Sequence, residues 1–218
     1  MSMRFTLTMK MALAIAFVCH SAPGQEMKGM PPRATAADYQ ASVKVGDLTL
    51  AADFTGHSVS TPDAVYSTEE YVVVEVAFFG PPQAHTTLNY ADFSLRINGK
   101  KTPLPSQPYA MVFKSLKDPE WVPPETVEKK SRTSLDSGGA GGGNDKPNPG
   151  DPPPVVHVPI EVERAMELKV QKASLPGGDR ALPGAGLLFF QHFGKDKSIH
   201  SVELIYDGPA GKAVLALQ

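Results

Sequence analysis

The sequence has very little cysteine and tryptophan, with one residue of each among 218. The single cysteine, Cys19, lies inside the apolar N-terminal segment described below, so a chain that loses this segment has no thiol. A disulfide framework and a cysteine-ligated metal centre are therefore excluded for such a chain, although an oxidising compartment would permit disulfides. Lipid attachment at Cys19 is not expected, because lipoprotein signals place Gly, Ala or Ser before the cysteine and Val18 stands there.

The sequence also lacks a strong excess of charge and a long apolar run. The formal net charge is −2 at pH 7, and it would be −4 without Arg4 and Lys10 of the N-terminal segment. A weakly acidic chain without a basic cluster is poorly suited to nucleic acid or to anionic membrane surfaces, so we expect no nucleic-acid partner. No later apolar run reaches the roughly 20 residues that a transmembrane helix needs. We therefore expect no transmembrane segment after removal of the signal.

The first 24 residues have the features of a secretory signal in the usual order. Arg4 and Lys10 carry positive charge, and the apolar run 11–18 follows them. The small residues Ala22-Pro23-Gly24 fit a cleavage site, although Ser21 could also end the signal. The alternative is an N-terminal hydrophobic helix that stays attached, but the apolar run is too short to span a bilayer. We predict a signal peptide over residues 1–24 and export to the periplasm or to the outside of the cell.

The strongest strand pattern runs from Tyr71 to Phe79, where only Glu75 interrupts apolar residues on both faces. A strand that is apolar on both faces belongs in the middle of a sheet. Alternating residues between 43 and 54 surround a Gly-Asp pair, and Phe93 to Ile97 leads into Asn98-Gly99. Both dipeptides are typical of β-hairpin turns, so this half of the chain predicts antiparallel β-structure.

A long interruption separates these strands from the rest of the chain. Residues 110–113 are the last short strand candidate before it. Periodicity is lost over residues 117–158, and residues 131–154 are low-complexity sequence rich in Gly and Pro. We predict a disordered internal loop, which costs a compact domain only about 0.6 kcal/mol per doubling of its length. Residues 25–37 similarly predict a flexible lead.

Periodic sequence resumes after the interruption. Residues 159–173 carry an apolar stripe at helical spacing, with acidic residues near the start and lysines near the end. Strand patterns follow at 187–191, 199–206 and 212–217. We expect the helix to cover an open end or edge of the β-structure, and the alternative is a helix that binds a partner. Residues 38–218 are therefore predicted to form one domain that the insertion interrupts.

Four segments carry a family resemblance: residues 71–76, 92–100, 186–190 and 202–206. They resemble the secreted bacterial immunoglobulin-like domains, sometimes called telokin-like, and the resemblance covers about residues 40–115 and 184–218. It implies an all-β, immunoglobulin-like β-sandwich of about seven to nine strands, here with one short helix and a disordered internal Gly/Pro-rich loop. That family occurs in exported antigens and lipoproteins without an assigned reaction, so the resemblance implies no catalytic residues. The insertion and the helix depart from its compact form.

Two motifs that could carry chemistry are incomplete. Gly56-His57-Ser58-Val59-Ser60 begins like a nucleophile elbow, but Ser60 stands where the second glycine is required and Thr61-Pro62 does not continue as a helix. The glycines of residues 138–143 are not followed by the Gly-Lys-Ser/Thr of a phosphate-binding loop. We interpret the first motif as a polar loop and the second as a linker, and we expect no cofactor.

The histidines outside the signal are scattered along the chain. They are His57, His85, His157, His192 and His200. None forms a short ligand pair and no cysteine assists them, so we expect no metal site. A spatial pair of His192 and His200, which flank one turn, is the alternative that would make a metal-handling domain.

Asp118 and Glu120 lie beside the only tryptophan, Trp121, in a proline-rich segment. Glycoside hydrolysis requires two carboxyl groups across a sugar site, one of them with a raised pKa, whereas acids in a proline-rich loop are typically solvated. Trp121 either anchors the start of the insertion on the sandwich or forms an exposed platform for a ligand or partner. These three residues are our candidate contact residues, and we assign no catalytic residue.

The sequence therefore favours an exported, non-enzymatic β-sandwich of the envelope or the exterior, which acts by binding or as a structural component. Its partner would be an envelope protein or a cell-wall component. The alternatives are an envelope-sugar-binding or hydrolytic domain that uses Asp118, Glu120 and Trp121, and a metal-handling domain that uses His192 and His200. A concave site that collects Trp121, Asp118 and a histidine would favour a hydrolase.

Overall fold

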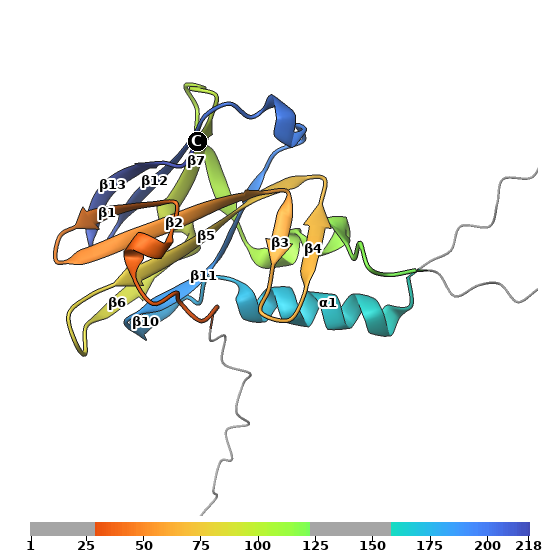
Figure 1. The fold of residues 1–218 in the computed structure, drawn as a ribbon, viewed down its shortest axis with the longest axis horizontal. Coiled ribbons are helices and arrows are strands. Elements are labelled where there is room, and N and C mark those ends of the chain that lie inside the picture. The colour runs from red at the N-terminus through yellow and green to blue at the C-terminus, as the bar shows by residue number, and fades with distance from the viewer. Residues whose placement is uncertain (1–28, 123–157) are drawn as a thin grey trace, which may run out of the picture.

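The computed structural model describes residues 29–122 and 158–218 (Figure 1). These residues form thirteen strands, one helix and five 3₁₀ turns. The strands are β1 (Ala41–Val45), β2 (Leu48–Gly56), β3 (Ser58–Ser60), β4 (Val65–Thr68), β5 (Tyr71–Phe79), β6 (His85–Leu88), β7 (Phe93–Ile97), β8 (Leu104–Gln107), β9 (Leu116–Lys117), β10 (Gly178–Ala181), β11 (Gly184–Gln191), β12 (Val202–Gly208) and β13 (Gly211–Ala216). The helix is α1 (Ile160–Ala173), and the 3₁₀ turns are Ala36–Asp38, Tyr90–Asp92, Tyr109–Met111, Phe113–Ser115 and Asp196–Ser198.

The fold is an all-β sandwich, as predicted. All the ladders between named strands are antiparallel within the described ranges. The strand count there exceeds the predicted seven to nine, because short segments such as β3, β4 and β9 pair in a small sheet where the sequence indicates only polar loop. The predicted strand at 110–113 is instead part of two 3₁₀ turns.

The largest sheet has eight strands in the order β1-β2-β5-β11-β8-β7-β12-β13. It curls until its outermost strands, β1 and β13, pack together (Figure 1). The Gln40 side chain, next to β1, donates a hydrogen bond to the carbonyl of Leu217, next to β13. The curled sheet therefore forms two layers around one core.

Strands from before and after the undescribed segment alternate within this sheet. Leu188 of β11 lies opposite Val74 of β5, and Leu204 of β12 lies opposite Leu95 of β7. All four side chains belong to the same buried cluster. The two halves of the sequence thus share one hydrophobic interior, and the C-terminal hairpin β12–β13 is part of it.

The central strand β5 lies between β2 and β11, in the middle of the sheet, as its sequence predicts. Its inner face contributes Val72, Val74, Val76 and Phe78 to the main core. Tyr71 and Val73 point to the outer face, where a second cluster covers them. Because both faces are covered, a strand with apolar side chains on each side is stable there.

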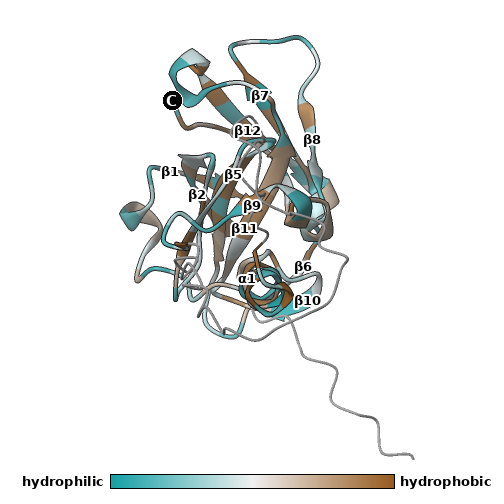
Figure 2. Ribbon diagram, turned by 90° about the vertical axis from the view of Figure 1, so that its right-hand side faces the viewer, coloured by the Kyte–Doolittle hydropathy of each residue, from teal (hydrophilic) through white to brown (hydrophobic). Residues whose placement is uncertain are grey.

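Helix α1 covers the outer face of β5 and β11, which corrects the prediction that it would cover an end or edge of the sandwich. Its buried side chains are Met166, Val170 and Ala173. They pack in the second cluster with Val73 of β5 and Phe189 of β11. A central strand pair with two apolar faces needs a second layer, and the amphipathic helix supplies it. In Figure 2 the helix is seen nearly end-on beside the sheet.

The segment predicted as a flexible lead is bound to the outer face wherever it is described. Met30 forms an isolated bridge with Ala185, and Arg33 pairs with both Asp53 and Glu75. Asp53 and Glu75 lie opposite each other on β2 and β5, an arrangement that is unfavourable for two like charges. Arg33 neutralises them, so the part of the lead that was predicted to be flexible is held on the sheet by an electrostatic interaction.

Several sequence predictions lie outside the described residues. They concern the signal over 1–24 with Cys19, the first part of the lead, His157 and the low-complexity tract 131–154. Within the described ranges, no helix combines the length and the apolar character that crossing a membrane requires.

Candidate functional site

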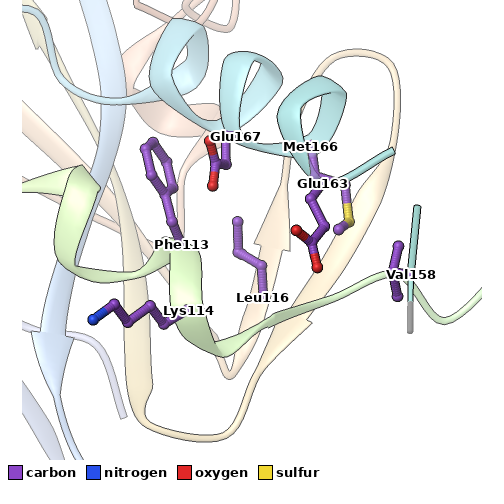
Figure 3. Close-up of a pocket in the computed structure, with 7 residues that line it drawn as sticks. All are labelled: Phe113, Lys114, Leu116, Val158, Glu163, Met166 and Glu167. Atoms are coloured by element: carbon purple, nitrogen blue, oxygen red, sulfur yellow. The ribbon is translucent and has the colours of Figure 1, made fainter. Parts of the chain in front are cut away.

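A hollow of about 290 Å³ lies between α1 and the segment that precedes β9 (Figure 3). We call it the α1 hollow. Its lining residues are Phe113, Lys114, Leu116, Val158, Glu163, Met166 and Glu167. In Figure 3 the side chains of Glu163, Met166 and Glu167 extend from the helix toward Phe113 and Leu116 on the opposite wall.

The floor of the α1 hollow is apolar and firmly held. Met166 is 5% exposed, and Phe113, Leu116 and Val158 pack as half-buried residues against the same cluster. The wall opposite α1 is fixed by Ser115, whose hydroxyl lies 2.7 Å from the hydroxyl of Thr68 and also donates to the Val112 carbonyl at 2.9 Å. A preformed apolar floor lowers the ordering cost of any molecule that binds on it.

Two carboxylates occupy the helical rim of the hollow. Glu163 and Glu167 are four residues apart on α1, so they lie on one face, where two like charges destabilise a helix. Within the part of the chain that the structure describes, neither carboxylate has an ion pair or a side-chain hydrogen bond, and Lys114 on the opposite wall does not reach them. The helical side of the rim is therefore negative, and its two carboxylates have no ion-pair partner among the described residues.

The chemistry of the α1 hollow suits binding better than catalysis. Its described lining residues include two carboxylates, one amine and four apolar side chains, but no serine, cysteine or histidine. Lysine and glutamate act as nucleophiles when a neighbouring group activates them, but Lys114 makes no ion pair with either glutamate of this set. An amine or guanidinium with an apolar stem would match both the rim and the floor.

The predicted contact residues lie next to this hollow but do not line it. Asp118, Glu120 and Trp121 follow β9, whose residue Leu116 forms part of the wall. The Asp118 carboxylate accepts a hydrogen bond of 2.9 Å from the Glu120 amide, and the Trp121 amide donates to the Asp118 carbonyl at 3.3 Å. The two acids therefore belong to one tight turn and do not face each other across a cavity. Trp121 is half-buried, between a packed anchor and an exposed platform.

The structure does not bring His192 and His200 together as a pair. His200 is exposed, and its amide donates to the Asn98 side chain at 2.7 Å. His192 instead lies beside His57, with ring centroids 6.3 Å apart and an angle of 22° between the planes. Among the described residues, no group of three or more potential metal ligands gathers in one place.

His57 lines a second hollow of about 510 Å³, which we call the histidine hollow, and His192 lies beside His57. Its lining includes His57, Glu69, Asp196 and the ring of Phe193, which is 72% exposed. Gly56 brings the β2–β3 bend close to Asp196, which lies in the loop between β11 and β12. The φ of Gly56 is +60°, and a Cβ there would lie 2.8 Å from a carboxylate oxygen of Asp196. Only glycine combines this backbone conformation with such a close approach.

The ring nitrogens of this pair have few hydrogen-bond partners among the described residues. His57 Nε2 lies 2.6 Å from the carbonyl oxygen of Gly194, whereas His57 Nδ1 and His192 Nε2 are buried without a hydrogen-bond partner among the described residues. Burial of the ring lowers the pKa of His192, and the positive charges of His57 and Lys100 lower it further against the opposing effect of Asp196. The pair therefore favours the neutral state of His192.

Sequence reasoning missed both hollows for identifiable reasons. The α1 hollow joins residues 113–116 to a helix more than 40 residues later, and the turn residues that form its wall resemble a strand in sequence. His57 and His192 are far apart in the chain. The only local signal was the Gly56-His57 pair, which belongs to the incomplete nucleophile-elbow motif that we interpreted as a polar loop.

Comparison of this chain with protein-family models, with curated proteins and with solved structures gives no match.

Proposed function

We propose that this chain is an exported, non-enzymatic binding protein that contacts its partner through the α1 hollow. The observation that carries the proposal is the pair of carboxylates, Glu163 and Glu167, which stand at the rim of a preformed apolar floor and have no ion-pair partner among the described residues. Like charges at this spacing cost helix stability, and a bound cation would relieve that cost. The immunoglobulin-like resemblance and the signal-like N-terminus support an envelope or secreted role for the same protein.

The partner that fits this surface presents a lysine or arginine next to an apolar side chain. The cationic head would pair with Glu163 and Glu167, while its methylene stem and the apolar neighbour would lie on Met166 and Leu116. Exposed ion pairs contribute only about 0–1 kcal/mol. The apolar contacts would therefore supply most of the affinity, and the charges would supply orientation.

Exposed apolar residues enlarge this surface beyond the hollow itself. Ile160, the first residue of α1, is 53% exposed, and it follows the lining residue Val158 by two positions. Val122, which ends the first described range, is 78% exposed. Exposed apolar side chains beside a concave floor are typical of protein contact sites, so an envelope protein is the partner class that we favour over a cell-wall component.

The enzymatic and metal-handling alternatives gain no support from the described geometry. Asp118 and Glu120 share one turn, which is unlike the facing carboxyl groups of a glycosidase. His192 and His200 lie on separate segments with different neighbours. A binding role remains the function that the α1 hollow supports best.

Site-specific photocrosslinking in intact cells tests this proposal. A photoreactive residue at Lys114, on the wall of the hollow, should capture a discrete partner. The same residue at Val214 on β13, which is 55% exposed, is the matched control and should not. Charge reversal by E163K with E167K should abolish capture at 114, whereas E161K, on the same helix but outside the lining, should leave it intact. Equal capture from both positions, or capture unaffected by the reversals, would contradict the proposal.

A further inference from the structure

The loop that joins β11 to β12 is held against the β2–β3 bend through the two histidines. The His192 amide donates to the Glu70 carbonyl at 2.8 Å, which fixes the start of the loop. Two residues later, the Gly194 carbonyl accepts from His57 Nε2 at 2.6 Å. The Asp196 carboxylate lies 3.7 Å from the same nitrogen. His57 is thus the main side-chain link between the bend and the loop.

The closed arrangement disfavours a positive charge on the His192 ring. A carbonyl oxygen only accepts, so His57 Nε2 donates to the Gly194 carbonyl and holds the loop beside the His192 ring. His57 Nδ1 and His192 Nε2 are both buried without a partner among the described residues. A protonated His192 would carry an N–H on its buried Nε2 without an acceptor among the described residues, and it would place a charge beside the ring of His57. Each consequence costs free energy in the closed arrangement.

The charged groups around the pair do not cancel this cost. Asp196 faces His57, and Glu69, which pairs with Lys117 at 2.6 Å, lines the same hollow. A positive charge on His192 is opposed by burial of the ring, by His57 and by Lys100 from the β7–β8 turn, against the opposing effect of Asp196. Lys195 from the loop adds a further cation to the hollow. A positive charge on His192 therefore works against closure of the loop.

We infer that the His57–His192 pair is an acid-sensitive latch, which holds the loop of residues 192–198 against the β2–β3 bend while His192 is neutral and releases it when His192 is protonated. Release separates the Gly194 carbonyl from His57 and displaces Phe193, the exposed aromatic residue at the mouth of the histidine hollow. This inference goes beyond the proposed function and does not depend on it, since the α1 hollow shares no residue with the latch.

The sign of the pH dependence follows from the neutral closed state. The closed loop binds fewer protons than the open loop below the ordinary histidine range, so acidification favours the open form. The opening constant should rise by up to about tenfold per pH unit for one proton taken up, starting below pH ~6.5. Above that pH the latch stays closed.

Hydrogen exchange of the full chain at pH 7.5 and pH 5.0 tests the latch. After correction for the intrinsic pH dependence of exchange, protection of residues 192–199 should fall by at least tenfold at pH 5.0, with no comparable change in β5. H192Q and H192F remove the titrating group and should make loop protection independent of pH. H200Q and H85Q change exposed histidines and should behave like the natural protein.

Two results would overturn the inference. One is equal protection of the loop at both pH values in the natural chain. The other is a loss of protection in H192Q and H192F that is as pH-dependent as in the natural chain. If neither variant folds, titration of the His192 ring by NMR in the natural chain decides the matter: a pKa at or above that of His200 rejects the latch, and a lower value together with loop opening supports it.

Discussion

The two faces of β5 differ in how they are covered: the inner face lies in a closed core, and the outer face lies beside the proposed contact site. The inner face is covered by strands of the same curled sheet, which enclose Val74 and Phe78 completely. The outer face is covered by a patchwork of α1, the β3–β4 hairpin, 3₁₀ turns and the lead that carries Arg33. The closed packing of the inner face leaves no room for a ligand. The mixed cover of the outer face leaves the α1 hollow where the helix meets the 3₁₀ turn that precedes β9.

This contrast suggests that binding surfaces arise where unlike elements meet. Strands in a ladder approach each other at one repeating distance, so their side chains interdigitate without gaps. A helix on a sheet, next to short turns, cannot match that regular spacing everywhere. Variants on the two faces test whether the inner face carries the fold and the outer face carries the proposed function.

Truncation after Gly211 should have the largest effect. It removes all of β13 after its first residue, with the buried Leu215, and the buried Leu217 that follows the strand. It thereby exposes β12 and the β1 side of the closed sheet. We expect no cooperative thermal transition in circular dichroism. A cooperative transition in the truncated chain would show that the inner core does not require closure of the sheet.

Core truncations on the two faces should differ in size. F78A removes a fully buried ring that packs edge-on against Phe93 and Tyr206, and it should cost about 3–5 kcal/mol of unfolding free energy. M166A removes a side chain of the outer cluster and should cost about 2–3 kcal/mol, because the floor of the α1 hollow is already open on one side. Urea unfolding measures both, and equal losses would contradict the comparison.

Loss of the lead's cation should have an intermediate effect. R33A leaves Asp53 and Glu75 opposite each other on neighbouring strands, and it should cost about 2 kcal/mol, less than a fully buried pair because Arg33 is partly exposed. E75Q in the same chain removes the repulsion and should restore at least half of the loss. Failure of that rescue would mean that Arg33 acts by packing over Tyr39 rather than by charge.

A smaller effect is expected from the histidine pair. Because burial lowers the pKa of His192, its contribution to stability is complete above pH ~6.5 and is lost as the pH falls toward the lowered value. The thermal midpoint of the natural chain should therefore decrease more than that of H192Q between pH 7 and pH 5. Calorimetry measures the difference, and parallel curves would assign the pH dependence to other groups.

Neutralising the rim of the α1 hollow should have the smallest effect on stability, and of the opposite sign. E163Q with E167Q relieves the like-charge repulsion on α1 and should stabilise the chain by about 0.3 kcal/mol while weakening partner capture. E161Q is the matched control on the same helix, and it should leave capture unchanged. A variant that is stabilised but captures the partner as well as the natural chain does would show that the two carboxylates take no part in the proposed contact.

The regular elements could be predicted from sequence because their signals are local. The alternation of Tyr71 to Phe79 placed β5 in the middle of the sheet, and the helix predicted from residue 159 to 173 is α1 to within one residue. Asn98-Gly99 forms the predicted turn, with φ of +52° and +64°. In each case the side-chain period or the turn chemistry is contained in a few adjacent residues.

The candidate sites could not be predicted in the same way. The wall of the α1 hollow depends on the Thr68–Ser115 hydrogen bond between β4 and a 3₁₀ turn that reads as strand. Arg33 carries no local sign that it neutralises two acids on β2 and β5, since the lead has no periodicity of its own. The sequence left a pair of His192 with His200 as an alternative, and it could not indicate that His57, far away in the chain, lies beside His192.

By itself, the sequence determined the β-rich class, the central strand, the single described helix and its amphipathic face, because these follow from repeats that short stretches contain. Only the tertiary structure decided that the sheet curls until β1 meets β13, that α1 lies on the outer face, and that His57 meets His192. Those outcomes depend on which packing of all the strands and the helix together buries the most apolar surface. No local sequence pattern encodes that choice.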